Sequence, residues 1–159
     1  MSGPVASDDL EVFVGEWAVE ARFPGGPLTG SPAAGGGTGP VGRRVFEWIL
    51  DGRYLAQRTE VSIPEAPDGL AIVACEPQEG GYTQHYYDSR GVSRLYAMTF
   101  AGGVWRLLRE SADFSPLDFA QRFTGTFSAD CNRIDGRWEK ALPGAGWELD
   151  FELSYSRIA

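Results

Sequence analysis

Histidine, cysteine and positive charge are scarce in this chain of 159 residues. It has one histidine and two cysteines, Cys75 and Cys131, which stand far apart and outside any C-x-x-C spacing. A zinc site and dithiol redox chemistry are therefore unsupported, and we expect two buried free thiols rather than a disulfide. Nucleophilic triads are disfavoured as well, because a single histidine can activate a nucleophile only if it faces the interior.

Acidic residues outnumber basic residues by 22 to 14, so the formal net charge is −8. We expect neither nucleic acid nor an anionic membrane as a partner, since no basic stripe offsets this charge. No apolar run has the length of a membrane-spanning helix. The first ten residues lack the cationic and apolar segments of a secretory signal, so we expect a cytoplasmic protein. A homodimer is compatible with the sequence.

Turn residues alternate regularly with short runs of β-branched and aromatic residues, a pattern typical of an antiparallel meander. A short helix is expected around residues 7–15, where Ser7 can cap the first turn. A sheet of about ten strands without covering helices should close on itself. The sequence therefore predicts one all-β domain over residues 1–159, an up-and-down antiparallel barrel. Its predicted strands are residues 15–23, 42–50, 53–62, 70–76, 82–88, 92–100, 104–110, 118–128, 133–140 and 147–158.

Residues 25–42 are rich in glycine and proline and contain almost no large apolar side chain. A phosphate-binding loop would end in G-K-[ST] and lead into a helix, whereas this segment leads into a predicted strand. We expect a flexible loop at the mouth of the barrel.

The last predicted strand indicates which side chains point inward. Trp147, Leu149, Phe151, Leu153 and Tyr155 alternate with acidic residues and serines, a period of two without an exception. One face of this strand should be buried along its whole length and the other solvated.

Two-residue turns extend the assignment of faces to other strands. Asp51-Gly52 suits a type I′ turn, which sets Trp48 opposite Leu55. Gly102-Gly103 suits the same turn in a later hairpin. The inner face inferred from these pairs combines aromatic side chains with arginine, glutamine and tyrosine.

The only histidine, His85, stands in the stretch G-G-Y-T-Q-H-Y-Y-D-S-R-G, residues 80–91. Residues 88–91 fit a three-residue loop closed by a glycine bulge, because Asp and Gly occupy the first and fourth positions. This loop sets Gln84 opposite Tyr96 and leaves His85 on the outer face. A loop of two or four residues would turn His85 inward, where it could hold haem or act as a base.

Several stretches resemble an uncharacterised bacterial family of lipocalin-like (calycin) β-barrels of unknown function: G-E-W after the short helix, L-D-G-R-Y-L, Y-Y-D-S-R-G, D-G-R-W-E and G-W-E-L-D-F-E-L-S-Y-S-R. The resemblance runs from Leu10 onward and implies an antiparallel barrel without naming a reaction. A distantly similar barrel, nitrobindin, binds haem through a histidine near its C-terminus and has the glycine-rich motif G-x-W-x-G-x-G-x-G. In this chain the corresponding segment is G-E-W-A-V-E-A-R-F, which lacks the later glycines of that motif, and no histidine follows His85. We therefore expect no cofactor and no metal.

The polar content of the inferred interior favours a ligand cavity, because buried polar groups need partners and a barrel of this size leaves room inside. We expect a small hydrophobic or amphipathic ligand whose acidic or carbonyl group binds Arg44, Arg94 or Arg109. A cyclase or isomerase with Tyr86 or Tyr96 as acid is an alternative, weakened by the lack of a predicted inward carboxylate, and a scaffold without a ligand is another. The predicted ligand-binding residues are Arg44, Phe46, Trp48, Gln57, Gln84, Tyr86, Arg94, Tyr96, Met98, Trp105, Arg109, Phe123 and Trp138.

Overall fold

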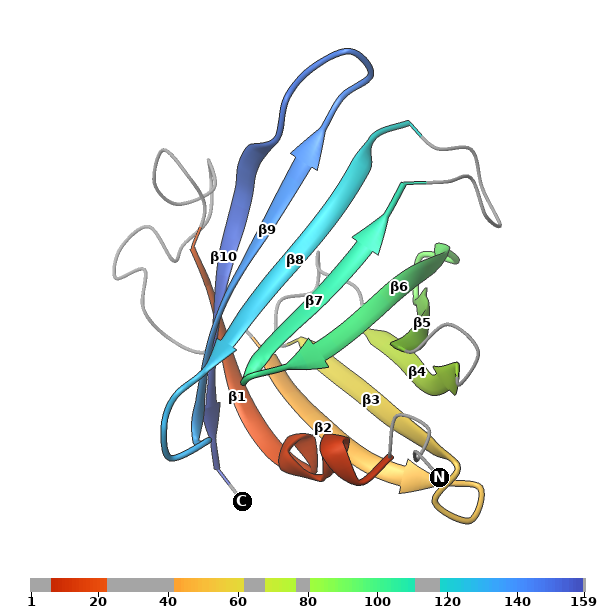
Figure 1. The fold of residues 1–159 in the computed structure, drawn as a ribbon, viewed down its shortest axis with the longest axis vertical. Helices are drawn as coiled ribbons and strands as arrows, with labels where there is room; N and C mark the ends of the chain where they lie inside the picture. Colours follow the sequence, from red (N-terminus) through yellow and green to blue (C-terminus); the bar gives the residue numbers. More distant parts are fainter. Residues whose placement is uncertain (1–6, 23–41, 62–67, 77–80, 111–117, 159) are drawn as a thin grey trace.

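The computed structural model describes residues 7–22, 42–61, 68–76, 81–110 and 118–158, and it shows a closed antiparallel barrel (Figure 1). A short 3-10 helix, η1 (Ser7–Phe13), precedes the barrel. The strands are β1 (Gly15–Arg22), β2 (Gly42–Ile49), β3 (Tyr54–Val61), β4 (Gly69–Glu76), β5 (Gly81–Asp88), β6 (Ser93–Ala101), β7 (Val104–Arg109), β8 (Ala120–Phe127), β9 (Arg133–Ala141) and β10 (Glu148–Arg157).

Each strand pairs with its neighbours in the chain, and β1 pairs with β10 to close the ring. The predicted all-β up-and-down barrel is thereby confirmed. All predicted strands are present, and their ends differ from the predicted ones by no more than two residues. The predicted flexible loop lies outside the described residues except for Gly42. Among the described residues, no helix is long and apolar enough to cross a membrane.

The turn residues adopt the backbone conformations that their types require. Asp51 and Gly52 have φ values of 66° and 74°, and Gly102 and Gly103 have 61° and 77°, as expected for type I′ hairpins. Leu50 also has a positive φ of 53°, so β2 ends one residue earlier than predicted. The first hairpin pairs Trp48 with Leu55, as the turn chemistry predicted.

The hairpin between β5 and β6 has the predicted three-residue loop. The Asp88 amide donates to the Val92 carbonyl at 3.1 Å, and Gly91, with a φ of 87°, donates to the Asp88 carbonyl at 2.9 Å. Gln84 consequently pairs with Tyr96. His85 lies half-buried on the outer face, which confirms its predicted direction.

The predicted unbroken alternation of the last strand is wrong at its start. Leu149 pairs with Glu139 but Phe151 pairs with Trp138, so Asp150 is the extra residue of a β-bulge. Because an inserted residue reverses the facing of everything before it, Leu149 shares the outer face with Glu139.

Trp147 follows Leu149 to the outer face. Its ring lies 4.3 Å beneath the guanidinium of Arg122, and Arg122 donates to Glu139 at 2.7 Å. The inward face of β10 therefore begins at the bulge and continues through Leu153 and Tyr155, both of which are buried.

One end of the barrel, which we call the plugged end, is closed by η1. Phe13 is fully buried, and its ring centroid lies 5.0–5.4 Å from those of Phe46, Phe100, Trp105 and Phe127. Aromatic edges and faces from four strands thus meet one side chain of the helix.

The end of η1 is held in place by Arg157 of β10. The Arg157 guanidinium donates to the carbonyls of Val12 and Val14, both at 2.7 Å, and lies 4.2 Å from the ring of Trp17. The indole of Trp17 in turn donates to the Phe13 carbonyl at 2.9 Å. Aromatic side chains thus pack the interior beneath the helix. We call the opposite end of the barrel the loop end.

Candidate ligand-binding cavity

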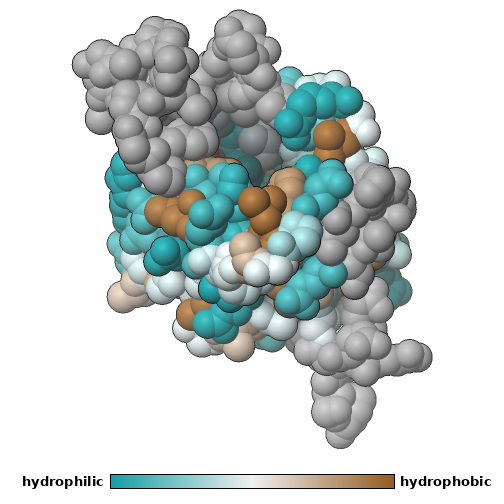
Figure 2. Space-filling model, turned by 90° about the horizontal axis from the view of Figure 1, so that it is seen from above, coloured by the Kyte–Doolittle hydropathy of each residue, from teal (hydrophilic) through white to brown (hydrophobic). Residues whose placement is uncertain are grey.

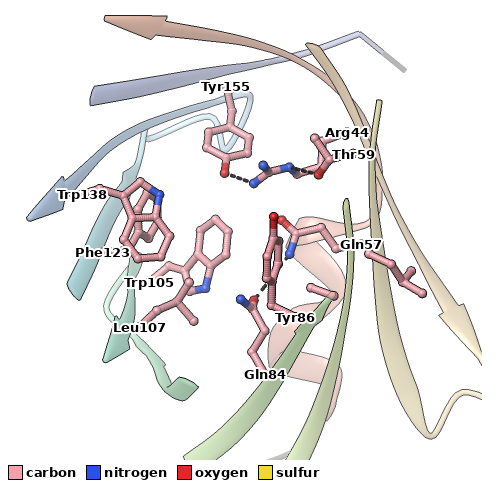
Figure 3. Close-up of a pocket in the computed structure, with 12 residues that line it drawn as sticks. Arg44, Gln57, Thr59, Gln84, Tyr86, Trp105, Leu107, Phe123, Trp138 and Tyr155 are labelled. Carbon is pink, nitrogen blue, oxygen red and sulfur yellow. Dashed lines mark hydrogen bonds between the residues drawn. The ribbon is translucent and has the colours of Figure 1, made fainter. Parts of the chain in front are cut away.

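A cavity of about 60 Å³ lies inside the barrel, between the aromatic layer of the plugged end and the loop end (Figure 3). Viewed from the loop end, the surface is hollowed, and hydrophilic residues prevail at the visible edge of the hollow (Figure 2). Seven predicted ligand residues line the cavity: Arg44, Gln57, Gln84, Tyr86, Trp105, Phe123 and Trp138. Its other lining residues are Thr59, Leu70, Ala71, Leu107 and Tyr155.

Arg44 supplies the positive charge of this cavity. Its Nε donates to Thr59 Oγ1 at 2.8 Å, and an NH group donates to the hydroxyl of Tyr155. The guanidinium carbon also lies 5.0 Å from the centre of the Tyr155 ring. Among the described residues, no carboxylate bonds to Arg44, so only neutral groups position this charge.

The Tyr155 hydroxyl stays protonated beside this charge. Burial raises the pKa of Tyr155, although the positive charge of Arg44 acts in the opposite direction. A neutral phenol accepts a hydrogen bond from Arg44 and keeps its own proton to donate. Tyr155 and Arg44 together therefore offer donors to an acceptor in the cavity.

Three more lining residues bring donors. The Trp105 indole is buried, and its N–H has no acceptor within the described part of the chain. The side chains of Gln57 and Gln84 are also buried. The Gln57 amide donates to Gln84 Oε1 over a long distance of 3.5 Å. A buried donor without a partner is costly, which makes this arrangement suited to a ligand rich in acceptors.

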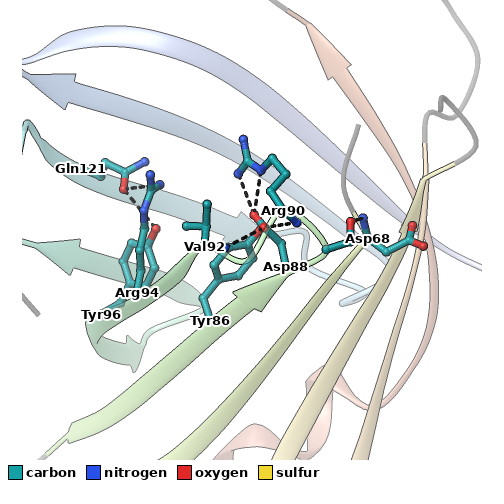
Figure 4. A network of polar contacts seen from close by, with 9 residues as sticks. Asp68, Tyr86, Asp88, Arg90, Val92, Arg94, Tyr96 and Gln121 are labelled. Carbon is teal, nitrogen blue, oxygen red and sulfur yellow. Dashed lines mark hydrogen bonds and ion pairs between the residues drawn. The ribbon is translucent and has the colours of Figure 1, made fainter. Parts of the chain in front are cut away.

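Tyr86 belongs to a network on the hairpin between β5 and β6 (Figure 4). Its hydroxyl donates to Asp88 Oδ2 at 2.8 Å, and the Arg90 guanidinium donates to the same oxygen at 2.6 Å. Burial disfavours the charge of Asp88, but the bonds from Arg90, Tyr86 and backbone amides outweigh it and lower its pKa to about 2. Burial and the bond to Asp88 raise the pKa of Tyr86 far above its usual value.

Two other predicted polar residues, Arg94 and Tyr96, form a separate group with Gln121, which the sequence did not predict. We call these three residues the Arg94 cluster. Arg94 and Tyr96 each donate to Gln121 Oε1, both at 3.1 Å. Arg109 is also buried and pairs with Gln121 across β7 and β8. These residues are not among those that line the cavity, although Arg94 pairs directly with the lining residue Tyr86.

Three predicted ligand residues lie away from the cavity, toward the plugged end. Phe46 packs on Phe13, and Met98 is buried in the core. The Trp48 indole donates to Glu11 of η1 at 2.8 Å. Alternation along a strand distinguishes inside from outside, but it carries no information on height along the barrel axis.

Phe123 forms part of the cavity wall because two glycines leave room for it. Gly125 and Gly136 pair across β8 and β9. A Cβ atom at Gly136 would lie only 2.5 Å from Phe123 Cζ, and one at Gly125 would lie 2.8 Å from Phe123 Cε2. The ring therefore lies on bare backbone, with its centroid 4.8 Å from that of Trp105 and 5.1 Å from that of Trp138.

No family model and no curated protein matches this chain. Among solved structures, it is similar to the crystal structure of Rv2717c from M. tuberculosis, with a TM-score of 0.60 over 96% of each chain. The two sequences are 13% identical, so the likeness concerns the barrel fold. Among the described residues, no three His, Cys, Asp or Glu side chains gather as metal ligands.

Proposed function

We propose that this protein binds a small, largely apolar molecule in the barrel cavity and recognises its acidic or carbonyl group through Arg44. The observation that carries the proposal is the guanidinium of Arg44, which faces the cavity with only neutral partners among the described residues. Arg44 is half-buried. A charge withdrawn from water is costly unless it is paired, and an anionic ligand would supply the missing partner.

The polarity of the cavity supports the same ligand class. The chain as a whole has a formal net charge of −8, yet its cavity is lined by an arginine and by neutral donors. A carboxylate on Arg44 would make charge-assisted hydrogen bonds, which are shorter and stronger than those between neutral groups. The aromatic walls formed by Trp105, Phe123 and Trp138 would contact the apolar part of the molecule.

The size of the cavity limits how the ligand is held. A cavity of about 150 Å³ holds benzene, whereas this one measures about 60 Å³. It therefore suits the head group of a ligand, and the apolar remainder would extend toward the loop end.

Catalysis by Tyr86 and a haem role for His85 receive less support. An acid or base works best with a pKa near the operating pH, but the pKa of Tyr86 is raised and that of its partner Asp88 is lowered to about 2. His85 lies on the outer face and pairs with Leu95 and Ile72, away from the residues that line the cavity.

Calorimetric titration with octanoate and with octanol, a pair that differs in the charged head group, tests this function. We expect octanoate to bind the wild-type protein about tenfold more tightly than octanol, since a charge-assisted pair is replaced by a neutral one. Arg44→Met should remove this preference, because it deletes the charge and keeps an unbranched apolar side chain. Native mass spectrometry of freshly purified protein should reveal a copurifying acidic molecule.

Arg58→Met is the matched control, because Arg58 lies on the outer face and pairs with Glu47. It should leave the preference for octanoate intact. Equal affinity for the two probes in the wild-type protein, or an unchanged preference in folded Arg44→Met, would remove Arg44 as the recognition element.

A further inference from the structure

A second inward guanidinium, that of Arg94, also lacks a carboxylate partner among the described residues. Its NH1 donates to the neutral side chain of Gln121 at 3.1 Å, and its Nε is buried without an acceptor in the part of the chain that the structure describes. The guanidinium carbon lies 5.9 Å from the centre of the Phe119 ring. Arg94 is thus held by an amide and a ring, and its charge is not neutralised by these contacts.

Asp88 is a buried carboxylate two residues along β5 from Tyr86, the register partner of Arg94, but it cannot serve Arg94. Asp88 already accepts five hydrogen bonds, from Tyr86, Arg90 and Val92. A carboxylate offers about four lone-pair sites, so this one is saturated. Figure 4 shows the two groups side by side as separate networks, with no bond drawn between them.

Asp150, another carboxylate of the loop end, also has a cation beside it. The carboxylate of Asp150, at the bulge of β10, lies 3.9 Å from Lys140. Asp88 and Asp150 are each paired with a cation of their own, whereas the partners of Arg44 and Arg94 among the described residues are neutral.

The two unmatched arginines stand on different walls of one barrel. In the strand order of the barrel, β3, β4 and β5 separate β2, which carries Arg44, from β6, which carries Arg94. Ten strands spaced about 4.8 Å apart and tilted by about 40° make a barrel roughly 20 Å across between backbones. Two long side chains that point inward from such walls leave a gap that a short ligand can span.

The wall between these arginines is continuous with the cavity. Arg94 pairs directly with Tyr86, which lines the cavity. Tyr96 of the Arg94 cluster has its ring centroid 5.7 Å from that of Trp138, another lining residue. A ligand whose head group is bound in the cavity would therefore meet the Arg94 cluster as it extends toward the loop end.

We propose that the ligand carries two anionic groups, one bound by Arg44 in the cavity and the other by Arg94, so that the protein prefers dicarboxylates with a short apolar spacer. This inference rests on the proposed function and narrows its ligand class. The aromatic walls of the cavity contact the apolar spacer, and each carboxylate supplies the counter-charge that its arginine lacks.

Pairs of acids with equal carbon number test the proposal: hexanoate with adipate, and octanoate with suberate, by calorimetric titration. In the wild-type protein, at least one diacid should bind about tenfold more tightly than its monoacid, as expected for one added charge-assisted contact. Arg94→Met should abolish this advantage, so that diacid and monoacid bind the variant with equal affinity. Arg106→Met, on the exposed outer face of β7, is the control and should behave like the wild-type protein.

The monomethyl ester of suberate makes the test independent of any variant. It keeps the length of the diacid and loses one charge, so it should bind wild-type protein no better than octanoate. If the diacid has no advantage, if the ester equals the diacid, or if folded Arg94→Met keeps the advantage, the two-anion proposal is overturned. Monoacid binding that depends on Arg44 would then leave the proposed function standing, whereas failure of all these acids to bind would overturn both.

Discussion

At the scale of single residues, Asp88 is the clearest example of one side chain that organises its surroundings. Its carboxyl group is inaccessible to solvent, although the side chain of its ion-pair partner Arg90 is largely exposed. It joins the hydroxyl of Tyr86 to the backbone amides of Arg90 and Val92. One carboxylate thereby stabilises both the loop of the hairpin and the orientation of a cavity-lining tyrosine.

The lowered pKa of Asp88 predicts a specific loss of stability in acid. Its folded-state value of about 2 lies below the ordinary value of 3.8, so its contribution is present above about pH 4 and is lost as the pH falls toward 2. A shift of this size corresponds to about 2 kcal/mol. Asp88→Asn should therefore lower the free energy of unfolding by about that amount at pH 7, and by less at pH 3, as measured by urea denaturation.

Asp135→Asn is the comparison for this prediction, because Asp135 pairs with Arg133 at an exposed site. Its effect should stay within about 0.5 kcal/mol at both pH values. An equal loss for Asp88→Asn at pH 7 and pH 3 would show that the charge of Asp88 does not stabilise the hairpin.

At the scale of elements, β8, β9 and β10 show how small backbone features shape the interior. The bulge at Asp150 reverses the facing of the side chains that precede it, so Trp147 packs on Arg122 at the outer surface. The paired glycines of β8 and β9 let the far end of the Phe123 ring approach the barrel wall closely. Local irregularities in three neighbouring strands therefore decide which large side chains reach the cavity.

Gly136→Ala should destabilise the barrel because its Cβ would overlap the ring of Phe123. Overpacking of this kind typically costs about 1–3 kcal/mol. Gly146→Ala, where nothing lies within 4 Å of the added Cβ, is the matched control and should be nearly neutral. Chemical denaturation of both variants measures the difference.

A double-mutant cycle attributes the effect to the ring. Phe123→Leu combined with Gly136→Ala should be more stable than the sum of the single changes predicts, by about 0.5 kcal/mol or more, since the smaller side chain relieves the overlap. Additive effects would mean that the cost of Gly136→Ala arises elsewhere.

At the scale of the whole molecule, the two ends of the barrel have different tasks. The plugged end is filled by Phe13 and the aromatic side chains around it, and the loop end holds the polar cavity. Arg157 connects the end of η1 to the barrel wall. Stability should therefore depend on the plugged end, and binding on the loop end.

Phe13→Ala should test this division of tasks. Removal of a fully buried phenylalanine typically costs about 3–5 kcal/mol, and Phe13 contacts side chains of β2, β6, β7 and β8. The melting temperature should fall strongly, whereas Leu142→Ala, in the exposed turn after β9, should change it little. A small effect of Phe13→Ala would show that η1 is not needed to close the barrel.

The sequence by itself determined the strands, their order and most of their facing. These properties are local: a glycine pair selects a type I′ turn, and a period of two separates the faces of a strand. The placement of His85 followed from four residues, 88–91, because loop length alone decides the register of that hairpin. Such inferences need no knowledge of distant parts of the chain.

Only the tertiary structure decided which inward residues form the cavity. Arg44 and Tyr155 are 111 positions apart and meet because β1 pairs with β10 and closes the ring. Phe46 lies on the same face of β2 as Arg44. It belongs to the plugged end because η1 enters the closed barrel there and brings Phe13 against it. The bulge at Asp150 had no local signal, because an inserted residue is defined by the partner strand that it fails to match. Height along the barrel and pairing across it arise from closure, and the period of a single strand contains neither.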